Sequence, residues 1–247
     1  MENDTNYPPW WNQAEKEIHE IVGGFVERIR SKLHSNPRIM VERKNPFLFR
    51  MRAIEGPDAL ANMIVDAFLS ASEETMFGNI LQAVALSVCK HANGGRLSSS
   101  SGIDIEYDEG NVRKLIQVKS GKNWGNSSQK KSLVRYFQQA EKILRQSDSQ
   151  IAVIKIEGCC YGPSQRTEYN THTRLVGGCF WKEVSNWGGV YSALMEVFGE
   201  HAENGMQEGR LLAKERIVTY LTEEGVIQEN RVSWDKLMKL VFRENEV

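Results

Sequence analysis

The sequence has few of the features that mark zinc-binding or disulfide-rich proteins. It holds four cysteines, and neither a C-x-x-C pair nor a histidine cluster accompanies them. This spacing excludes the common structural zinc sites, and the adjacent Cys159 and Cys160 cannot readily form a disulfide with each other. We therefore expect reduced thiols in a cytoplasmic protein.

Long apolar runs are also missing. The longest, near residues 80–89, is interrupted by Gln82 and Ser87 and is too short to cross a bilayer. The N-terminal stretch MENDTNYPPWW is acidic and has no apolar core, so we expect neither a signal peptide nor a membrane partner. The sequence has no P-loop, dinucleotide fingerprint or serine-hydrolase elbow, which argues against those enzyme classes.

The chain lacks a net charge that would suggest a globally basic nucleic-acid binder. Its 31 basic and 32 acidic residues give a formal charge of −1. The distribution is uneven, however, because residues 111–146 carry nine Lys or Arg against one acid, Glu141. A local basic face is what contact with phosphates requires, whereas a merely solvated helix face usually mixes both signs.

Polar residues share one face of a predicted hairpin in the middle of the chain. Residues 103–107 and 114–119 alternate as strands do, and Gly110 and Asn111 supply the turn between them. Side chains two apart lie on the same face, so Asp104, Gln117 and Lys119 can converge at one end of a sheet. Carboxylate and amide oxygens suit Mg²⁺, which lowers the pKa of a bound water and neutralises charge on a phosphate. A surface hairpin with solvated charges is the alternative.

The pattern Asp104, then Gln117-Val118-Lys119 at the end of an apolar strand, resembles the PD-(D/E)XK nuclease motif. The resemblance implies that Asp104 is a metal ligand and that Lys119 is the catalytic lysine. Gln117 stands at the second acidic position, where the motif more often has Glu, and is predicted as a catalytic residue and second ligand. If Gln117 is a bystander, the second ligand is another acid: Glu106, Glu73 or Glu74.

Short segments elsewhere are similar to type II restriction endonucleases that cut within GGNCC-centred sites. They are Trp10-Trp11, Asn45-Pro46-Phe47, Phe77-Gly78-Asn79 and Trp234-Asp235-Lys236-Leu237. This resemblance implies an α/β fold with a restriction-endonuclease-like core, a central mixed sheet flanked by helices, with helical N- and C-terminal additions. It also implies a Mg²⁺-dependent homodimer, double-stranded DNA with a short palindromic site as substrate, and a companion DNA methyltransferase.

The length and 40% hydrophobic content fit one large domain. We predict a single nuclease domain over residues 1–247, with a helical part (1–91), a catalytic sheet core (92–182) and a second helical part (183–247). Helices are expected at 8–34, 57–71, 77–91 and 127–146, with a connector at 35–56. A buried strand at 151–156 after the 127–146 helix implies a parallel pair with 114–119. A long loop (158–174) and a strand (175–180) follow.

Eight residues are candidates for contact with DNA. The Gly-rich loop 120–126 and the basic helix after it can approach phosphates. The long loop offers Arg and Asn, the residue types suited to reading guanine and adenine; an ordinary exposed loop is the alternative. The candidates are Lys122, Asn123, Ser127, Lys130, Lys131, Arg135, Arg166 and Asn170.

Two other functions compete with site-specific cleavage. One is a cleavage-deficient nucleic-acid-binding module with the same fold, which the neutral Gln117 favours. The other is a DNA repair or structure-specific nuclease. Asp104 and Lys119 favour cleavage, and the long loop favours sequence reading, so we predict a type II site-specific deoxyribonuclease.

Overall fold

The computed structural model describes residues 7–54, 56–202 and 206–243. Its described residues group into two compact units, which we treat separately. The sheet unit lies within residues 1–23 and 77–199, and the helical unit lies within residues 24–76 and 200–247. The predicted single domain with three parts stays a prediction.

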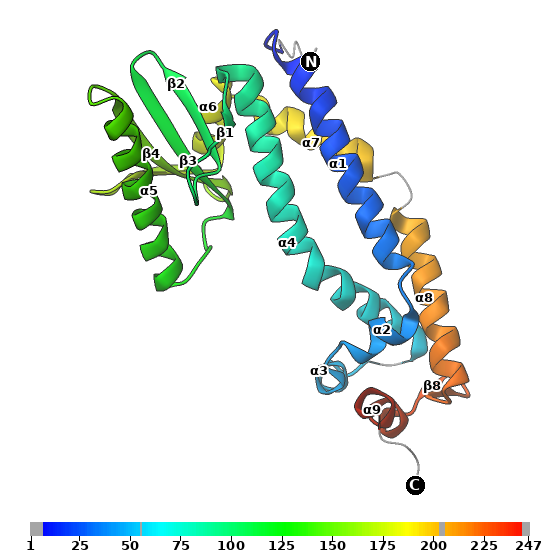
Figure 1. Cartoon of the computed structure of the whole chain (residues 1–247). Coiled ribbons are helices and arrows are strands. Elements are labelled where there is room, and N and C mark those ends of the chain that lie inside the picture. The colour runs from blue at the N-terminus through cyan, green and yellow to red at the C-terminus, as the bar shows by residue number, and fades with distance from the viewer. Residues whose placement is uncertain (1–6, 55, 203–205, 244–247) are drawn as a thin grey trace. The chain divides into compact units, whose positions relative to one another are not determined.

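Figure 1 shows the elements in chain order. The helices are α1 (Trp11–Leu33), α2 (Pro37–Glu42), α3 (Pro46–Met51), α4 (Pro57–Asn93), α5 (Ser127–Ser147), α6 (Gly178–Ser185), α7 (Val190–Ala202), α8 (Met206–Glu223) and α9 (Trp234–Phe242). The strands are β1 (Arg96–Leu97), β2 (Ile105–Glu109), β3 (Val112–Gly121), β4 (Ala152–Tyr161), β5 (Gln165–Glu168), β6 (Thr173–Val176), β7 (Ile227–Gln228) and β8 (Arg231–Val232).

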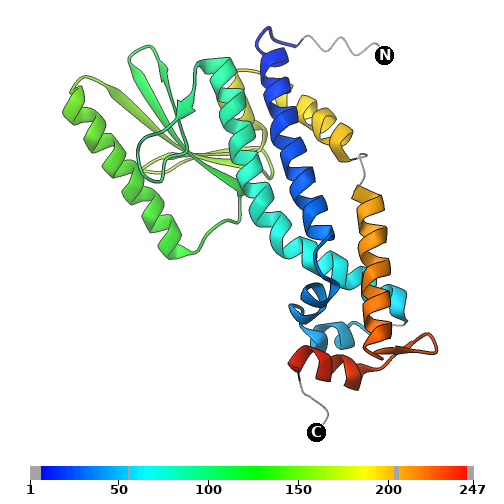
Figure 2. The same cartoon turned by 45° about the vertical axis from the view of Figure 1, so that its right-hand side comes forward.

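The sheet unit contains a mixed six-stranded sheet in the order β1-β2-β3-β4-β6-β5. Figure 2 shows the same sheet in a second view. β2 and β3 form an antiparallel hairpin, and Gly110 in its turn has a φ of +59°. β3 and β4 are parallel and are joined through α5, as the sequence predicts. This mixed sheet with helices around it and at both ends confirms the predicted fold class.

α5 covers one face of the sheet. Leu133, Phe137 and Ala140 on α5 are buried against Leu115 of β3 and Ile103, the residue two before β2. Because side chains alternate along a strand, Gln117 and Lys119 share the α5 face with Leu115.

α6 lies against the opposite face. A Cβ added at Gly158 of β4 would come within 2.3 Å of the Phe180 ring of α6, so only glycine fits there. On the same face, Lys114 of β3 forms an ion pair with Glu183 of α6 at 2.6 Å. The two faces therefore carry different side chains of β3, and the polar face with Gln117 and Lys119 belongs to the α5 side.

The helical unit is held by an apolar cluster. Leu33, Leu60, Ile64 and Ile217 are at most 2% exposed in it. β7 and β8 form a small separate hairpin ahead of α9, which the sequence prediction missed. Among the described residues, no helix combines the length and apolar character needed to cross a membrane.

Two helical predictions need correction. The expected helices at 57–71 and 77–91 are one helix, α4, because the polar residues between them include neither Gly nor Pro. The expected connector at 35–56 contains α2 and α3. Its Asn-Pro pairs are helix starts: Asn36 and Asn45 are N-caps, each followed by Pro at the first helical position.

The predicted long loop at 158–174 is wrong. β4 continues to Tyr161, and Gln165–Glu168 forms β5, paired antiparallel with β6. The predicted strand at 175–180 is also wrong beyond Val176, because Gly177 has a φ of +57° and α6 begins at Gly178. The first half of β4 is not buried on both faces either, since Ile154 is 41% exposed.

Candidate active site

Asp104 lies immediately before β2, whose first residue, Ile105, pairs with Ile116 of β3. The backbone N–H of Asp104 donates to the Ile116 carbonyl at 2.9 Å. Its carboxylate accepts two hydrogen bonds at 2.7 Å, from the Val118 N–H and from Nε2 of Gln82 on α4. Burial raises the pKa of Asp104, and the Val118 N–H and the charge of Lys119 oppose that rise.

Gln117 presents an oxygen with no partner. The side chain is 7% exposed on β3, and its Nε2 donates to the Gly102 carbonyl at 2.6 Å. That bond fixes the orientation of the amide, because only the nitrogen can donate to a carbonyl. Among the described residues, Oε1 has no hydrogen-bond partner. An orphaned buried oxygen costs free energy, so its presence points to a ligand.

Lys119 is two residues further along the same face. Its Nζ lies 4.6 Å from the centre of the Trp124 ring, a cation–π arrangement. Burial lowers the pKa of Lys119, and the charges of Asp104 and Glu157 counteract that fall. Asp104 thus binds β3 at Val118, the residue between Gln117 and Lys119, which brings the predicted carboxylate, amide and ammonium to the same part of β3.

A buried carboxylate borders this trio. Glu157 of β4 is the register partner of Gln117 and is 5% exposed. It accepts a hydrogen bond from Trp124 Nε1 at 2.6 Å, and its oxygens lie 3.1 Å from His172 Nε2 and 2.9 Å from Arg174 Nε. Burial alone would raise its pKa, but the three partners outweigh burial, and the pKa of Glu157 is lowered.

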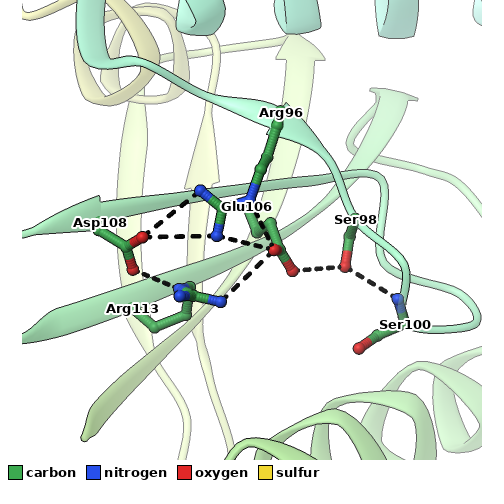
Figure 3. Close-up of polar contacts among 6 residues, drawn as sticks. All are labelled: Arg96, Ser98, Ser100, Glu106, Asp108 and Arg113. Carbon is green, nitrogen blue, oxygen red and sulfur yellow. Dashed lines mark hydrogen bonds and ion pairs between the residues drawn. The ribbon is translucent and has the colours of Figure 1, made fainter.

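Glu106 belongs to a different cluster of polar contacts, with Arg96, Ser98 and Arg113 (Figure 3). Its carboxylate lies 2.9 Å from Arg96 and 3.4 Å from Arg113, and Ser98 donates to it at 2.8 Å. Asp108 binds the same two arginines. Glu106 is therefore already neutralised by cations.

The other two alternative ligands, Glu73 and Glu74, belong to the helical unit. Within the described part of the chain, no group of three or more His, Cys, Asp or Glu side chains is placed to hold a metal ion. Protein oxygens for a metal here would come from Asp104 and from the amide of Gln117.

The candidates for phosphate contact lie on one stretch of surface. Lys122 and Asn123 lie in the turn after β3, and both are exposed. α5 then begins with a capping box, in which Asn126 and Gln129 bond each other's backbone N–H groups and Asn126 is the N-cap. The candidates on α5, Ser127, Lys130, Lys131 and Arg135, are all exposed.

Arg166 and Asn170 are both exposed but do not share a loop. Arg166 sits within edge strand β5, where it pairs with Glu168 at 2.6 Å. Asn170 lies in the turn between β5 and β6. The structure therefore separates the two predicted base readers onto a strand and a turn.

An apolar hollow of about 500 Å³ lies elsewhere in the sheet unit. Its walls include Phe77, Leu81, Trp181, Leu194 and Phe198. None of the predicted catalytic residues lines it, so the hollow and the polar site are separate features.

Sequence reasoning missed Glu157 and its partners. Glu157 did carry a signal, because it is an acid within an otherwise apolar strand and such a group needs partners. Its partners Trp124, His172 and Arg174 are far apart in the sequence, and only the fold brings them together.

Comparison with known proteins adds an independent finding. A family model described as type II restriction endonuclease EcoO109I matches residues 12–205. The match includes the whole of the six-stranded sheet and every predicted site residue. A search of curated proteins finds no match to the chain.

Proposed function

The chain belongs to the type II restriction endonuclease EcoO109I family, and from that premise we propose that it is a site-specific double-stranded DNA endonuclease of the PD-(D/E)XK type. Asp104, Gln117 and Lys119 are its catalytic residues in this proposal. The observation that supports it most is the orphaned Oε1 of the buried Gln117, two residues from Lys119 and next to Val118, whose N–H binds Asp104.

The donor set fits Mg²⁺. Mg²⁺ prefers oxygen ligands and keeps several waters, so one carboxylate and one amide oxygen suffice when the substrate phosphate supplies more. Asp104 supplies the negative charge. Burial raises its pKa, and a cation nearby would lower it again. A bound Mg²⁺ supplies an acidified water and charge neutralisation at the phosphate.

The remaining chemistry belongs to the chain. Gln82 and the Val118 N–H hold the Asp104 carboxylate in one orientation. The Gly102 carbonyl accepts a hydrogen bond from the amide nitrogen of Gln117, so the amide oxygen of Gln117 points away from Gly102. Lys119 orients the attacking water and stabilises the negative charge that develops on the phosphate.

The exposed basic residues are the proposed contacts with DNA. Lys122, Asn123 and the first turns of α5 contact the phosphate backbone in this proposal. Arg166 and Asn170 approach base edges from β5 and from the β5–β6 turn. In this proposal a two-fold homodimer binds a short palindromic, GGNCC-centred site. A companion methyltransferase protects the host DNA.

One observation favours a second candidate, a binding module that does not cleave. Both Asp104 oxygens already accept hydrogen bonds, and the second acidic position is a neutral amide. Such a module would keep the basic surface and bind DNA without cutting it.

The deciding experiment incubates the protein with phage DNA and Mg²⁺ alongside Asp104→Ala and Lys119→Met. We expect discrete fragments from the wild type and intact DNA from both variants, with DNA binding retained in a gel-shift assay. A smear would indicate a nonspecific nuclease. Binding without any cleavage by the wild type would favour the second candidate.

A further inference from the structure

The ammonium of Lys119 packs on the ring of Trp124, and a hydrogen bond holds that ring in place. The cation–π contact with Trp124, at 4.6 Å, is its closest aromatic contact in the described structure. Trp124 comes from the loop after β3, where Gly125 has a φ of +71°. A loop side chain needs an anchor if its ring is to hold a catalytic group in place.

Glu157 provides that anchor. The indole N–H of Trp124 donates to Glu157 Oε1 at 2.6 Å, a short bond to a charged acceptor. Glu157 is itself immobilised by His172 on Oε2 and by Arg174 on Oε1. Arg174 also donates to the Lys122 carbonyl, so it ties the same loop a second time.

His172 extends the arrangement to the edge of the sheet. Its ring lies 5.7 Å from Phe137 of α5 and 5.0 Å from Tyr169, and only 7% of its side chain is exposed. Glu157 is thus fixed by groups from other elements, while its neighbour on β3, Gln117, leaves its own oxygen unused.

We propose that Glu157 is a positioning residue that acts on Lys119 through Trp124. Glu157 holds the indole by its N–H, and the indole face holds the ammonium. Glu157 does not touch the substrate, because its carboxylate is occupied by internal partners. The catalytic role of Lys119 rests on the proposed function, whereas Glu157 and Trp124 are not among the predicted site residues.

The test uses graded changes to Trp124 and Glu157. Trp124→Leu removes both the ring and the N–H, Trp124→Phe keeps a ring without the N–H, and Glu157→Gln keeps the shape without the charge. Trp181→Phe is the matched control, since Trp181 is buried and also donates its N–H, to the Cys160 carbonyl at 2.8 Å, but does so on the α6 face.

We expect Trp124→Leu to slow single-turnover cleavage by about 10- to 100-fold, because displacing a catalytic group by about 1 Å has an effect of that order. DNA affinity should stay unchanged. Trp124→Phe keeps a ring but loses the bond to Glu157, so Trp124→Phe and Glu157→Gln should both cut at rates between those of Trp124→Leu and the wild type, and a wild-type rate in both would show that Glu157 does not act through Trp124. Cleavage by Trp124→Leu at the rate of Trp181→Phe would overturn the proposal.

A spectroscopic measurement makes the test independent of cleavage. The ring current of Trp124 should shift the NMR signals of the Lys119 ε-methylene protons upfield in ¹³C-lysine-labelled protein, with Lys119→Met used for assignment. The shift should vanish in Trp124→Leu and remain in Trp181→Phe; an unchanged shift in Trp124→Leu would also overturn the proposal. If the wild type fails to cut DNA, the proposed function fails, and the NMR comparison alone decides whether Trp124 positions Lys119.

Discussion

The amide of Gln117 makes a prediction that separates stability from function. Replacing Gln117 by Met keeps a similar volume but removes the buried, unpartnered Oε1 and the hydrogen bond from Nε2 to the Gly102 carbonyl. If Oε1 is a ligand oxygen, it is a cost to the metal-free protein and a benefit once a cation is bound.

The magnitudes follow from those two atoms. Removing a buried unsatisfied oxygen relieves roughly 1–3 kcal/mol, and breaking a hydrogen bond costs roughly 0.5–1.5 kcal/mol, with a further penalty of similar size for the stranded carbonyl. These contributions offset each other, so the free energy of unfolding without metal should change by no more than about 1 kcal/mol. With Mg²⁺ at about 100 times its Kd, the wild type should gain about 2.7 kcal/mol.

The assay is urea unfolding with and without MgCl₂. Gln117→Met should match the wild type without metal and gain far less stability when Mg²⁺ is added. Gln138→Met, at an exposed position of α5, is the control for the chemical change alone and should keep the full gain. An equal Mg²⁺-dependent gain in Gln117→Met and the wild type would refute the ligand role of the amide oxygen. Cleavage titrated against Mg²⁺ should follow the same order.

Three further predictions test the surroundings of the site. Replacing Lys130, Lys131 and Arg135 together by alanine should flatten the slope of log affinity against log salt by about 0.9 for each phosphate that is no longer neutralised, and an unchanged slope would place this part of α5 away from DNA. Arg166→Ala should cost roughly 1–3 kcal/mol of discrimination between sites while nonspecific binding persists, and cutting with unaltered fidelity would count against its role as a reader. The pKa of Glu157 is lowered from 4.5, so its contribution to stability is present above that pH and is lost as the pH falls through the folded pKa. Urea unfolding across the acid range should therefore show a steeper loss for the wild type than for Glu157→Gln, and parallel curves would contradict the buried ion cluster.

Local pattern in the sequence was enough to predict the hairpin and the polar face. Alternation at 114–119 and the Gly110-Asn111 turn determine a two-stranded unit, because the side-chain period of a strand is two. That period places Gln117 and Lys119 on one face without any tertiary information. The same reasoning predicted the 127–146 helix and its parallel crossover, since a strand, a helix and a strand in succession leave few other arrangements.

Boundaries that depend on competing tertiary contacts were not predictable in this way. The segment at 158–174 is rich in turn residues, yet part of it is β5, because pairing with β6 satisfies its backbone. The polar residues between 71 and 77 suggested a break, yet α4 continues through them. Propensity is a weak guide at such places, since packing elsewhere along the same element decides the outcome.

The tertiary structure alone decided which polar groups the trio meets. Gln82 of α4 donates a hydrogen bond to Asp104, and Glu157 of β4 accepts one from Trp124, whose ring contacts Lys119. Glu106 looked equivalent to Asp104 in the sequence, because both alternate onto one face of the same predicted strand. Two arginines neutralise Glu106, whereas Asp104 meets a backbone N–H and an amide. Sequence determines which face a side chain occupies, but the charges facing it come from other strands and helices, and those charges decide what the side chain can bind.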